Sequence, residues 1–293
     1  MFIATLIAAQ GLTAGDISAA RDRLADAGCV PLEEWGWLDS GVAADIVFGL
    51  DPKAARFALE DVFPATDVIV QPLEGRRKAL LVADMDSTMI TVECIDELAD
   101  YAGIKPQIAE ITERAMRGEL DFGSALDARV LLLKGLDEGV IARCLADKVK
   151  IMPGAKALVR TMKANGATAI LVSGGFTRFA EPVAQEIGFD RAIANVLGLA
   201  NGTLDGTVGK PIIDADTKLR TLLGARVEFG LADTATLAVG DGANDLTMIK
   251  RAGLGIAYHA KPIVAAAAGA RVDHNDLTAL LYAQGYAQTE WMA

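Results

Sequence analysis

The chain has 293 residues, 52% hydrophobic and 23% charged, so it can bury a substantial core and divide it between more than one domain. The formal net charge of -11 and the isoelectric point near 4.7 exclude a protein that binds nucleic acid through a basic face. The cysteines at 29, 94 and 144 lack metal-ligand spacing, so we expect reduced thiols in a cytoplasmic protein. The apolar N-terminus has no positive n-region and is too short to span a bilayer, so no membrane association is expected.

The first segment predicts a small α+β domain. Four apolar stretches are typical of strands and two amphipathic stretches are typical of helices. In chain order these are strand 2–9, helix 14–28, strands 29–38 and 42–50, helix 52–63 and strand 66–73. The βαββαβ order is that of a ferredoxin-like fold and resembles the ACT-type regulatory modules of amino-acid metabolism. The resemblance implies that residues 1–75 bind an amino-acid effector such as serine, or pair two chains into a homodimer.

A turn-rich and charged stretch at 72–78 ends this segment, and we interpret its basic cluster at 75–78 as a solvated linker. From residue 79 onward, strands alternate with helices. Continuous apolar runs, which are typical of strands in a parallel sheet covered on both faces, occur at 79–84, 167–173, 234–240 and 254–258. The expected fold class is therefore α/β, with a doubly wound, mostly parallel, Rossmann-like sheet.

Two further features interrupt this alternation. Residues 93–150, between the first two strands, show helical patterns without a strand signal and predict an inserted helical cap. Residues 196–208 predict a hairpin that turns at Asn201-Gly202. We therefore expect a second domain at 76–293, in which residues 76–92 and 151–293 form the core.

Polar residues follow three of the predicted strands, at the sheet edge where open α/β proteins bind ligands. They form the stretches 84–88, 173–175 and 240–245. Carboxylates that meet at one edge repel one another unless a cation is present, and Mg²⁺ prefers oxygen ligands. Asp84 and Asp241 are then the predicted side-chain ligands, and Asp86 is close enough to add its backbone carbonyl.

The same residue types suit phosphoryl transfer. One aspartate can attack phosphorus, while the second protonates the leaving oxygen and then activates water. Ser173 offers a hydroxyl, and Gly174 and Gly175 offer backbone N–H groups at the start of a helix. Lys218, in the first turn of a helix, opposes the macrodipole and is better explained as a phosphate partner than as a solvated side chain. Singly, each feature also fits a cap or a turn, including the pair at 244–245; their combination favours a site.

These motifs, in this order, resemble those of the haloacid dehalogenase-like phosphohydrolases over residues 79–285, and the helical cap is similar to that of the phosphoserine phosphatase branch. The resemblance implies Mg²⁺-dependent hydrolysis of O-phospho-L-serine to L-serine and phosphate through an aspartyl-phosphate, the last step of serine biosynthesis. The implied catalytic residues are the nucleophile Asp84 and the general acid/base Asp86. The implied metal-binding residues are Asp84, Asp86 through its carbonyl, and Asp241, supported by Asp245. The implied substrate-binding residues are Ser173, Gly174 and Lys218 for the phosphoryl group, Asn244, Glu93 for the ammonium group and Arg129 for the carboxylate.

The cap residues can also be judged by spacing. Phe122, Leu126, Arg129 and Leu133 fall on one helical stripe, so Arg129 shares a face with three apolar residues. A forked grip on a carboxylate explains this better than a packed stem with its head in solvent. Phe122 either closes over the substrate or packs in the core. Glu93 belongs to an acidic helix face, for which simple solvation is the alternative; its position one turn past the nucleophile loop favours a substrate role.

Two alternatives stay open from the sequence. The core motifs fix the chemistry and not the substrate, so a phosphatase or phosphotransferase acting on another small phosphorylated metabolite fits them equally. A regulatory protein that binds an amino acid through its N-terminal module, without catalysis, is the alternative from another class.

Overall fold

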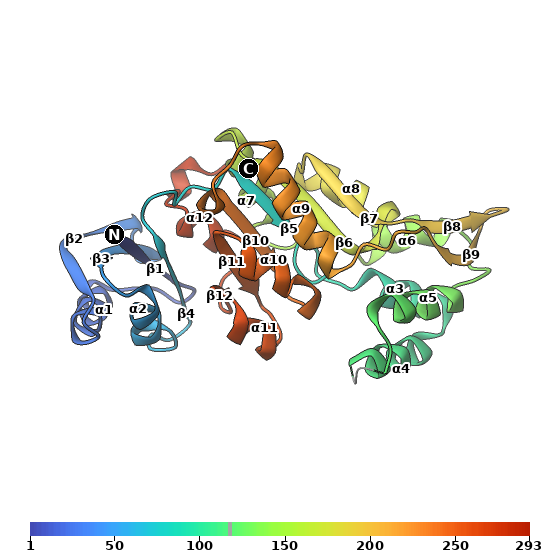
Figure 1. Cartoon of the computed structure of the whole chain (residues 1–293), viewed down its shortest axis with the longest axis horizontal. Coiled ribbons are helices and arrows are strands. Elements are labelled where there is room, and N and C mark those ends of the chain that lie inside the picture. The colour runs from blue at the N-terminus through green and yellow to red at the C-terminus, as the bar shows by residue number, and fades with distance from the viewer. Residues whose placement is uncertain (117–118) are drawn as a thin grey trace.

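The computed structural model describes residues 1–116 and 119–293, which form two large sheets beside one another (Figure 1). A four-stranded antiparallel sheet has the order β2-β3-β1-β4, and a six-stranded parallel sheet has the order β12-β11-β10-β5-β6-β7. Residues 117 and 118 of the predicted cap lie outside the described residues. None of the helices described is both long and apolar enough to cross a membrane.

The N-terminal elements confirm the predicted βαββαβ order. They are β1 (Phe2–Ala8), α1 (Ala14–Asp26), β2 (Val30–Asp39), β3 (Ala43–Gly49), α2 (Pro52–Leu59) and β4 (Thr66–Pro72). The helix starts follow from local chemistry: Thr13 and Asp16 form a capping box at α1, and Asp51 caps α2, which has proline at its first position. Apolar side chains of both helices and of the sheet form a separate cluster of buried residues.

The larger sheet confirms the doubly wound α/β prediction. Its strands are β5 (Leu80–Ala83), β6 (Thr168–Phe176), β7 (Arg191–Asn195), β10 (Thr236–Gly240), β11 (Leu254–Tyr258) and β12 (Ala270–Val272). Alternate residues of β5 face opposite sides, so two apolar layers form. One layer lies under α7 (Ala155–Ala164) and α8 (Thr177–Ile187); the other lies under α9 (Ala215–Glu228), α10 (Leu246–Arg251) and α11 (Pro262–Ala267). The short helix α12 (Ala279–Ala283) follows β12.

Of the five helices described between β5 and β6, four fall within the predicted cap at 93–150, and these four lie at the right of Figure 1. They are α3 (Cys94–Ala102), α4 (Lys105–Met116), α5 (Phe122–Leu132) and α6 (Gly139–Asp147). The predicted hairpin is also confirmed, as β8 (Leu197–Ala200) and β9 (Thr203–Val208). Its turn residues Asn201 and Gly202 have φ of 53° and 78°, which these residue types tolerate. Since β9 packs against α5, the hairpin supports the helical segment.

The structure places Gly174 and Gly175 within a strand, just before the helix that was predicted to follow them. Strand β6 continues to Phe176, with a shift of register against β7, and α8 begins only at the next residue. Their lack of side chains allows close approach at this end of the strand. An added Cβ would lie 3.0 Å from Cζ of Phe122 at Gly174 and 2.8 Å from Oδ2 of Asp86 at Gly175.

The interpretation of residues 75–78 as a solvated linker holds for Gly75 and Arg77, which are exposed, but is wrong for Arg76 and Lys78. Arg76 forms two hydrogen bonds of 2.7 Å with Asp45 and donates to two backbone carbonyls at 282 and 283. Lys78 is 4% exposed, and its ammonium group donates to two further carbonyls. Composition alone could not reveal this, because Asp45 lies 31 residues away and the two carbonyl groups, in α12, lie more than 200 residues along the chain.

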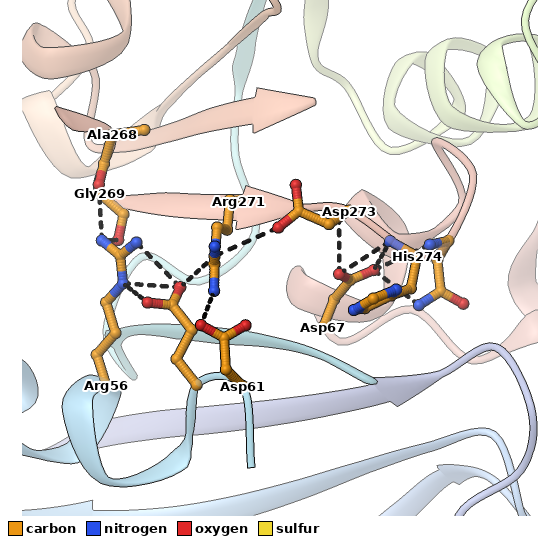
Figure 2. Close-up of polar contacts among 10 residues, drawn as sticks. Arg56, Asp61, Asp67, Ala268, Gly269, Arg271, Asp273 and His274 are labelled. Atoms are coloured by element: carbon orange, nitrogen blue, oxygen red, sulfur yellow. Dashed lines mark hydrogen bonds and ion pairs between the residues drawn. The ribbon is translucent and has the colours of Figure 1, made fainter. Parts of the chain in front are cut away.

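A second set of polar contacts joins β4 to the segment around β12 (Figure 2). Asp67 accepts hydrogen bonds of 2.8–3.3 Å from the backbone N–H groups of residues 273–275. Nearby, Arg56 donates to the backbone carbonyls of Ala268 and Gly269, at 2.6 and 2.7 Å, while Arg271 pairs with Asp61. Charge-assisted hydrogen bonds of this kind join the small sheet to the large one.

Replacing Asp67 with alanine should lower the free energy of unfolding by about 3 kcal/mol. Asp67 is 4% exposed, and its loss leaves three backbone N–H groups without their acceptor. Urea denaturation followed by circular dichroism measures the effect. Asp22→Ala, at an exposed position of α1, is the control; equal changes in both variants would contradict the role of Asp67.

Candidate active site

The centre of the site is a buried ion triplet at the carboxyl end of β5. Asp84 follows the strand directly, and its Oδ1 lies 2.5 Å from Nζ of Lys218. The same ammonium group lies 2.6 Å from Oδ1 of Asp245. Burial by itself lowers the pKa of Lys218, but the two carboxylates outweigh it and raise the pKa above its ordinary value. Lys218 is therefore a fully buried cation, which accounts for a lysine near the start of α9.

A third carboxylate makes this an acidic cluster. Oxygen atoms of Asp84, Asp241 and Asp245 all lie within 4.8 Å of one another. Burial and then repulsion by Asp84 raise the pKa of Asp241 to about 6 and that of Asp245 to about 7. Thr88 donates to Asp241 and the N–H of Gly242 donates to Asp245, which orients both side chains. One ammonium group does not balance three carboxylates, and the all-oxygen donor set fits a hard divalent cation.

Asp86 occupies a different environment from Asp84. Its Oδ1 accepts a hydrogen bond of 3.0 Å from the N–H of Cys94, and its Oδ2 lies 3.5 Å from the hydroxyl of Ser173. Burial, followed by repulsion from Glu93 and Asp84, raises the pKa of Asp86 to about 7. A carboxyl group that exchanges its proton near neutral pH fits a general acid and base.

Hydrogen bonds from side chains hold the last residues of β6 in place. Ser173 accepts a hydrogen bond of 2.8 Å from the N–H of Gly175. The side chain of Asn195 donates to the carbonyl of Gly174 and accepts from the N–H of Ile213, both at 2.8 Å. Sequence reasoning missed Asn195, which is 2% exposed, because it ends β7, a five-residue strand with no clear apolar run. It connects β6 to the segment that leads into α9.

A cavity of about 650 Å³ separates this edge of the sheet from the helical segment. Predicted site residues that line it from the sheet side are Asp84, Asp86, Gly174, Asp241 and Asn244. Those that line it from the helical side are Glu93, Phe122 and Arg129. The remaining predicted residues, Ser173, Lys218 and Asp245, are fully buried next to this lining: Lys218 joins Asp84 to Asp245, and Ser173 lies 3.5 Å from Asp86. The structure thus gathers all eleven predicted residues around one cavity.

The helical side of the cavity supplies one acidic side chain, Glu93, and one basic side chain, Arg129. Glu93 stands at the start of α3 and accepts a hydrogen bond of 2.7 Å from Ser87; desolvation raises its pKa, against that hydrogen bond. Arg129 donates only weakly within its own helix, to the carbonyl of Ala125 at 3.3 Å. Burial lowers the pKa of Arg129. Phe122 lies close to the backbone of β6 across the cavity, so the helices and the sheet meet above the carboxylates.

Comparison with known proteins gives the family. Residues 81–250 match the haloacid dehalogenase-like hydrolase family. A phosphoserine phosphatase of Archaeoglobus fulgidus is 44% identical over 240 residues, which are 81% of this chain and 67% of that protein. Another, of Albidiferax ferrireducens, is 44% identical over 215 residues, which are 72% of this chain and 91% of that protein. This chain belongs to the phosphoserine phosphatase family of the haloacid dehalogenase-like hydrolases.

Solved structures agree with this family. A probable phosphoserine phosphatase of Vibrio cholerae superimposes with a TM-score of 0.77 at 32% identity, over 99% of this chain and 87% of that one. A phosphoserine phosphatase captured as a phospho-aspartyl intermediate analogue gives 0.65 at 35% identity, over 70% of this chain and 98% of that one. The chain spans between 55% and 67% of the length of several curated phosphoserine phosphatases that it matches.

One further cavity residue of this family member escaped sequence reasoning. Lys261 lines the cavity from the end of β11, a strand that was predicted at 254–258. The sequence analysis assigned site residues only to the stretches after three other strands, at 84–88, 173–175 and 240–245. The usable signal was a lysine three residues beyond an apolar strand in the same parallel sheet.

Proposed function

We propose that this chain is a Mg²⁺-dependent phosphatase that hydrolyses O-phospho-L-serine to L-serine and phosphate, the last step of serine biosynthesis. The observation that carries the proposal is the contrast between Asp84, ion-paired with Lys218, and Asp86, a carboxyl group with a pKa raised to about 7. The names of the relatives support the substrate, and the intermediate analogue of one of them supports a covalent route.

In this mechanism Asp84 is the nucleophile. Lys218 contacts Oδ1, which leaves Oδ2 to form a bond with phosphorus while the bond from phosphorus to the seryl oxygen breaks. Asp86 gives its proton to that oxygen, and L-serine leaves. The Asp86 carboxylate then takes a proton from water, whose oxygen attacks the phosphorus of the aspartyl-phosphate. The bond between phosphorus and Oδ2 of Asp84 breaks, phosphate is released, and Asp84 returns as a carboxylate while Asp86 returns to its protonated state.

Mg²⁺ would be held by Asp84, the backbone carbonyl of Asp86 and Asp241, with Asp245 supporting the site. When bound, the cation neutralises charge on the phosphoryl group and on the carboxylates. The chain itself holds the phosphoryl group through Ser173, the N–H of Gly174 and the ammonium group of Lys218. Preorganised donors of this kind stabilise the charge that develops in the transition state.

The helical side would recognise the amino-acid part. Glu93 receives the ammonium group and Arg129 grips the carboxylate, while Phe122 closes the cavity over the substrate and Asn244 contacts it from the sheet side. The residues proposed for the phosphoryl group come from the sheet side, and those proposed for the ammonium and carboxylate groups come from the inserted helices. This separation supports the assignment.

Adding Mg²⁺ to chelator-treated protein should raise its melting temperature by roughly 5 °C at about 100 times the dissociation constant. The cation relieves the repulsion within the acidic cluster, and it binds the folded chain only. Differential scanning fluorimetry measures the shift. Asp241→Asn should lose most of it, whereas an undiminished shift in that variant would contradict the proposed ligand set.

Phosphate release over a panel of small phosphomonoesters, with and without Mg²⁺, tests the proposed function. We expect the highest kcat/KM for O-phospho-L-serine and no turnover without the cation. A higher kcat/KM for another phosphomonoester would assign the substrate to the alternative class of small phosphorylated metabolites.

We further propose that residues 1–75 are a regulatory module, that residues 76–293 are the catalytic domain with its cap at about 93–150, and that the protein works in the cytoplasm. The βαββαβ order of the small sheet supports the first part, and three unpaired, buried cysteines support the last. Noncompetitive inhibition of the full chain by L-serine would support an effector role. Sedimentation of a homodimer would support a role in pairing.

A further inference from the structure

The cavity wall carries more negative than positive charge. Among the described residues that line it, the carboxylates are Asp84, Asp86, Glu93, Asp96 and Asp241, and the cations are Arg129 and Lys261. The chain as a whole has a formal net charge of -11. A phosphomonoester arrives as an anion, so both the overall field and most of the wall oppose its entry.

Lys261 has a fixed backbone beside the acidic cluster. Its N–H donates to the carbonyl of Asp241 at 3.4 Å, and α11 begins at the next residue. Two residues earlier, His259 has a φ of 42°, and its Nε2 lies 3.0 Å from the carbonyl oxygen of Asn275. The Lys261 side chain is exposed and makes no ion pair with residues 1–116 or 119–293. The ammonium group of Lys261 therefore lies at the sheet side of the cavity without an ion-pair partner among the described residues.

The two cations of the wall belong to different parts of the chain. Arg129 lies on α5. Burial lowers the pKa of Arg129, and the negative charges of Asp96 and Glu93, at the start of α3, counteract that fall. Lys261 lies beyond β11, and its charge opposes the rise in pKa that desolvation causes at Glu93. Arg129 therefore belongs to the helical side of the cavity, whereas Lys261 is joined through its backbone N–H to Asp241, at the sheet edge where the phosphoryl donors collect.

We propose that Lys261 is a binding residue for the phosphoryl group, at the sheet side of the cavity. The inference rests on the proposed phosphatase function and extends it. The ammonium group attracts a phosphomonoester dianion or inorganic phosphate and offsets the repulsion from Asp241 and Glu93. It takes no part in making or breaking bonds, so it acts on KM and on the affinity for phosphate, and not on kcat.

Steady-state kinetics of Lys261→Gln, Lys261→Arg and Lys250→Gln test this with O-phospho-L-serine. Lys250 is exposed on α10 and does not line the cavity, so it is the matched control. Lys261→Gln should raise KM about tenfold at low salt with kcat nearly unchanged. High salt should shrink the difference because it screens exposed charges. Lys261→Arg should restore the KM.

Product inhibition identifies which end of the substrate Lys261 contacts. Lys261→Gln should weaken inhibition by inorganic phosphate by a similar factor and leave competitive inhibition by L-serine unchanged. An unchanged KM, an equal change in Lys250→Gln, or a loss confined to L-serine would overturn the inference. If the unaltered chain hydrolyses no O-phospho-L-serine, the proposed function itself fails; normal turnover with an unaffected Lys261→Gln variant refutes this inference alone.

Discussion

Asp84→Asn should abolish phosphatase activity, with a loss of at least about 10⁴-fold in kcat, while the chain stays folded. The amide is isosteric with the carboxylate but is a poor nucleophile toward phosphorus. Lys218 keeps its contact with Asp245, so the buried cation retains a partner. Phosphate release from O-phospho-L-serine measures activity, and circular dichroism measures folding.

Asp22→Asn serves as the control, because it makes the same chemical change at an exposed position on α1. Full activity is expected there. A folded Asp84→Asn variant with substantial turnover would exclude the covalent mechanism and leave direct attack by water as its replacement.

Arg129→Ala should raise the KM for O-phospho-L-serine by roughly 10- to 100-fold, as expected for loss of charge-assisted hydrogen bonds to a carboxylate. The same variant should hydrolyse an aryl phosphate, which lacks an amino-acid part, almost as well as the unaltered chain. The difference arises because the phosphoryl donors come from the sheet, and Arg129 comes from α5.

Arg143→Ala is the matched control, since Arg143 is exposed on α6 and does not line the cavity. Equal losses on both substrates in the Arg129 variant would show that Arg129 supports the site as a whole. In that case the proposed recognition of the substrate carboxylate would be wrong.

The sequence predicted most of the sheet and the gathering of the site residues because both follow from local patterns. Four continuous apolar runs marked four of the six strands, and polar residues directly after three of them marked one edge. Asp84, Asp241 and Lys218 come together because parallel strands and the helices that follow them share an orientation. The hairpin was predicted in the same way, from the Asn201-Gly202 turn and the residues on either side of it.

What escaped prediction depends on partners distant in the chain or on strands too short for periodicity. The strand β12 has three residues, and β7 has five with mixed polarity, so Asn195 went unnoticed. Arg76 was interpreted as solvated because local composition gives no information about its distant partners, Asp45 and the carbonyl groups of α12. Gly174 and Gly175 continue β6, whereas the apolar run predicted a strand that ends at Ser173, because glycine occurs in turns and at sites of close approach alike.

The central claim is that Asp84 carries the phosphoryl group during turnover. Acid quenching of the chain during steady-state hydrolysis of O-phospho-L-serine, followed by proteolysis and mass spectrometry, tests it directly. The account predicts one phosphoryl group on the peptide that contains Asp84, lost on alkaline treatment and absent from Asp84→Asn. Rapid turnover without a phosphorylated peptide, or a phosphoryl group on a different residue, would contradict it.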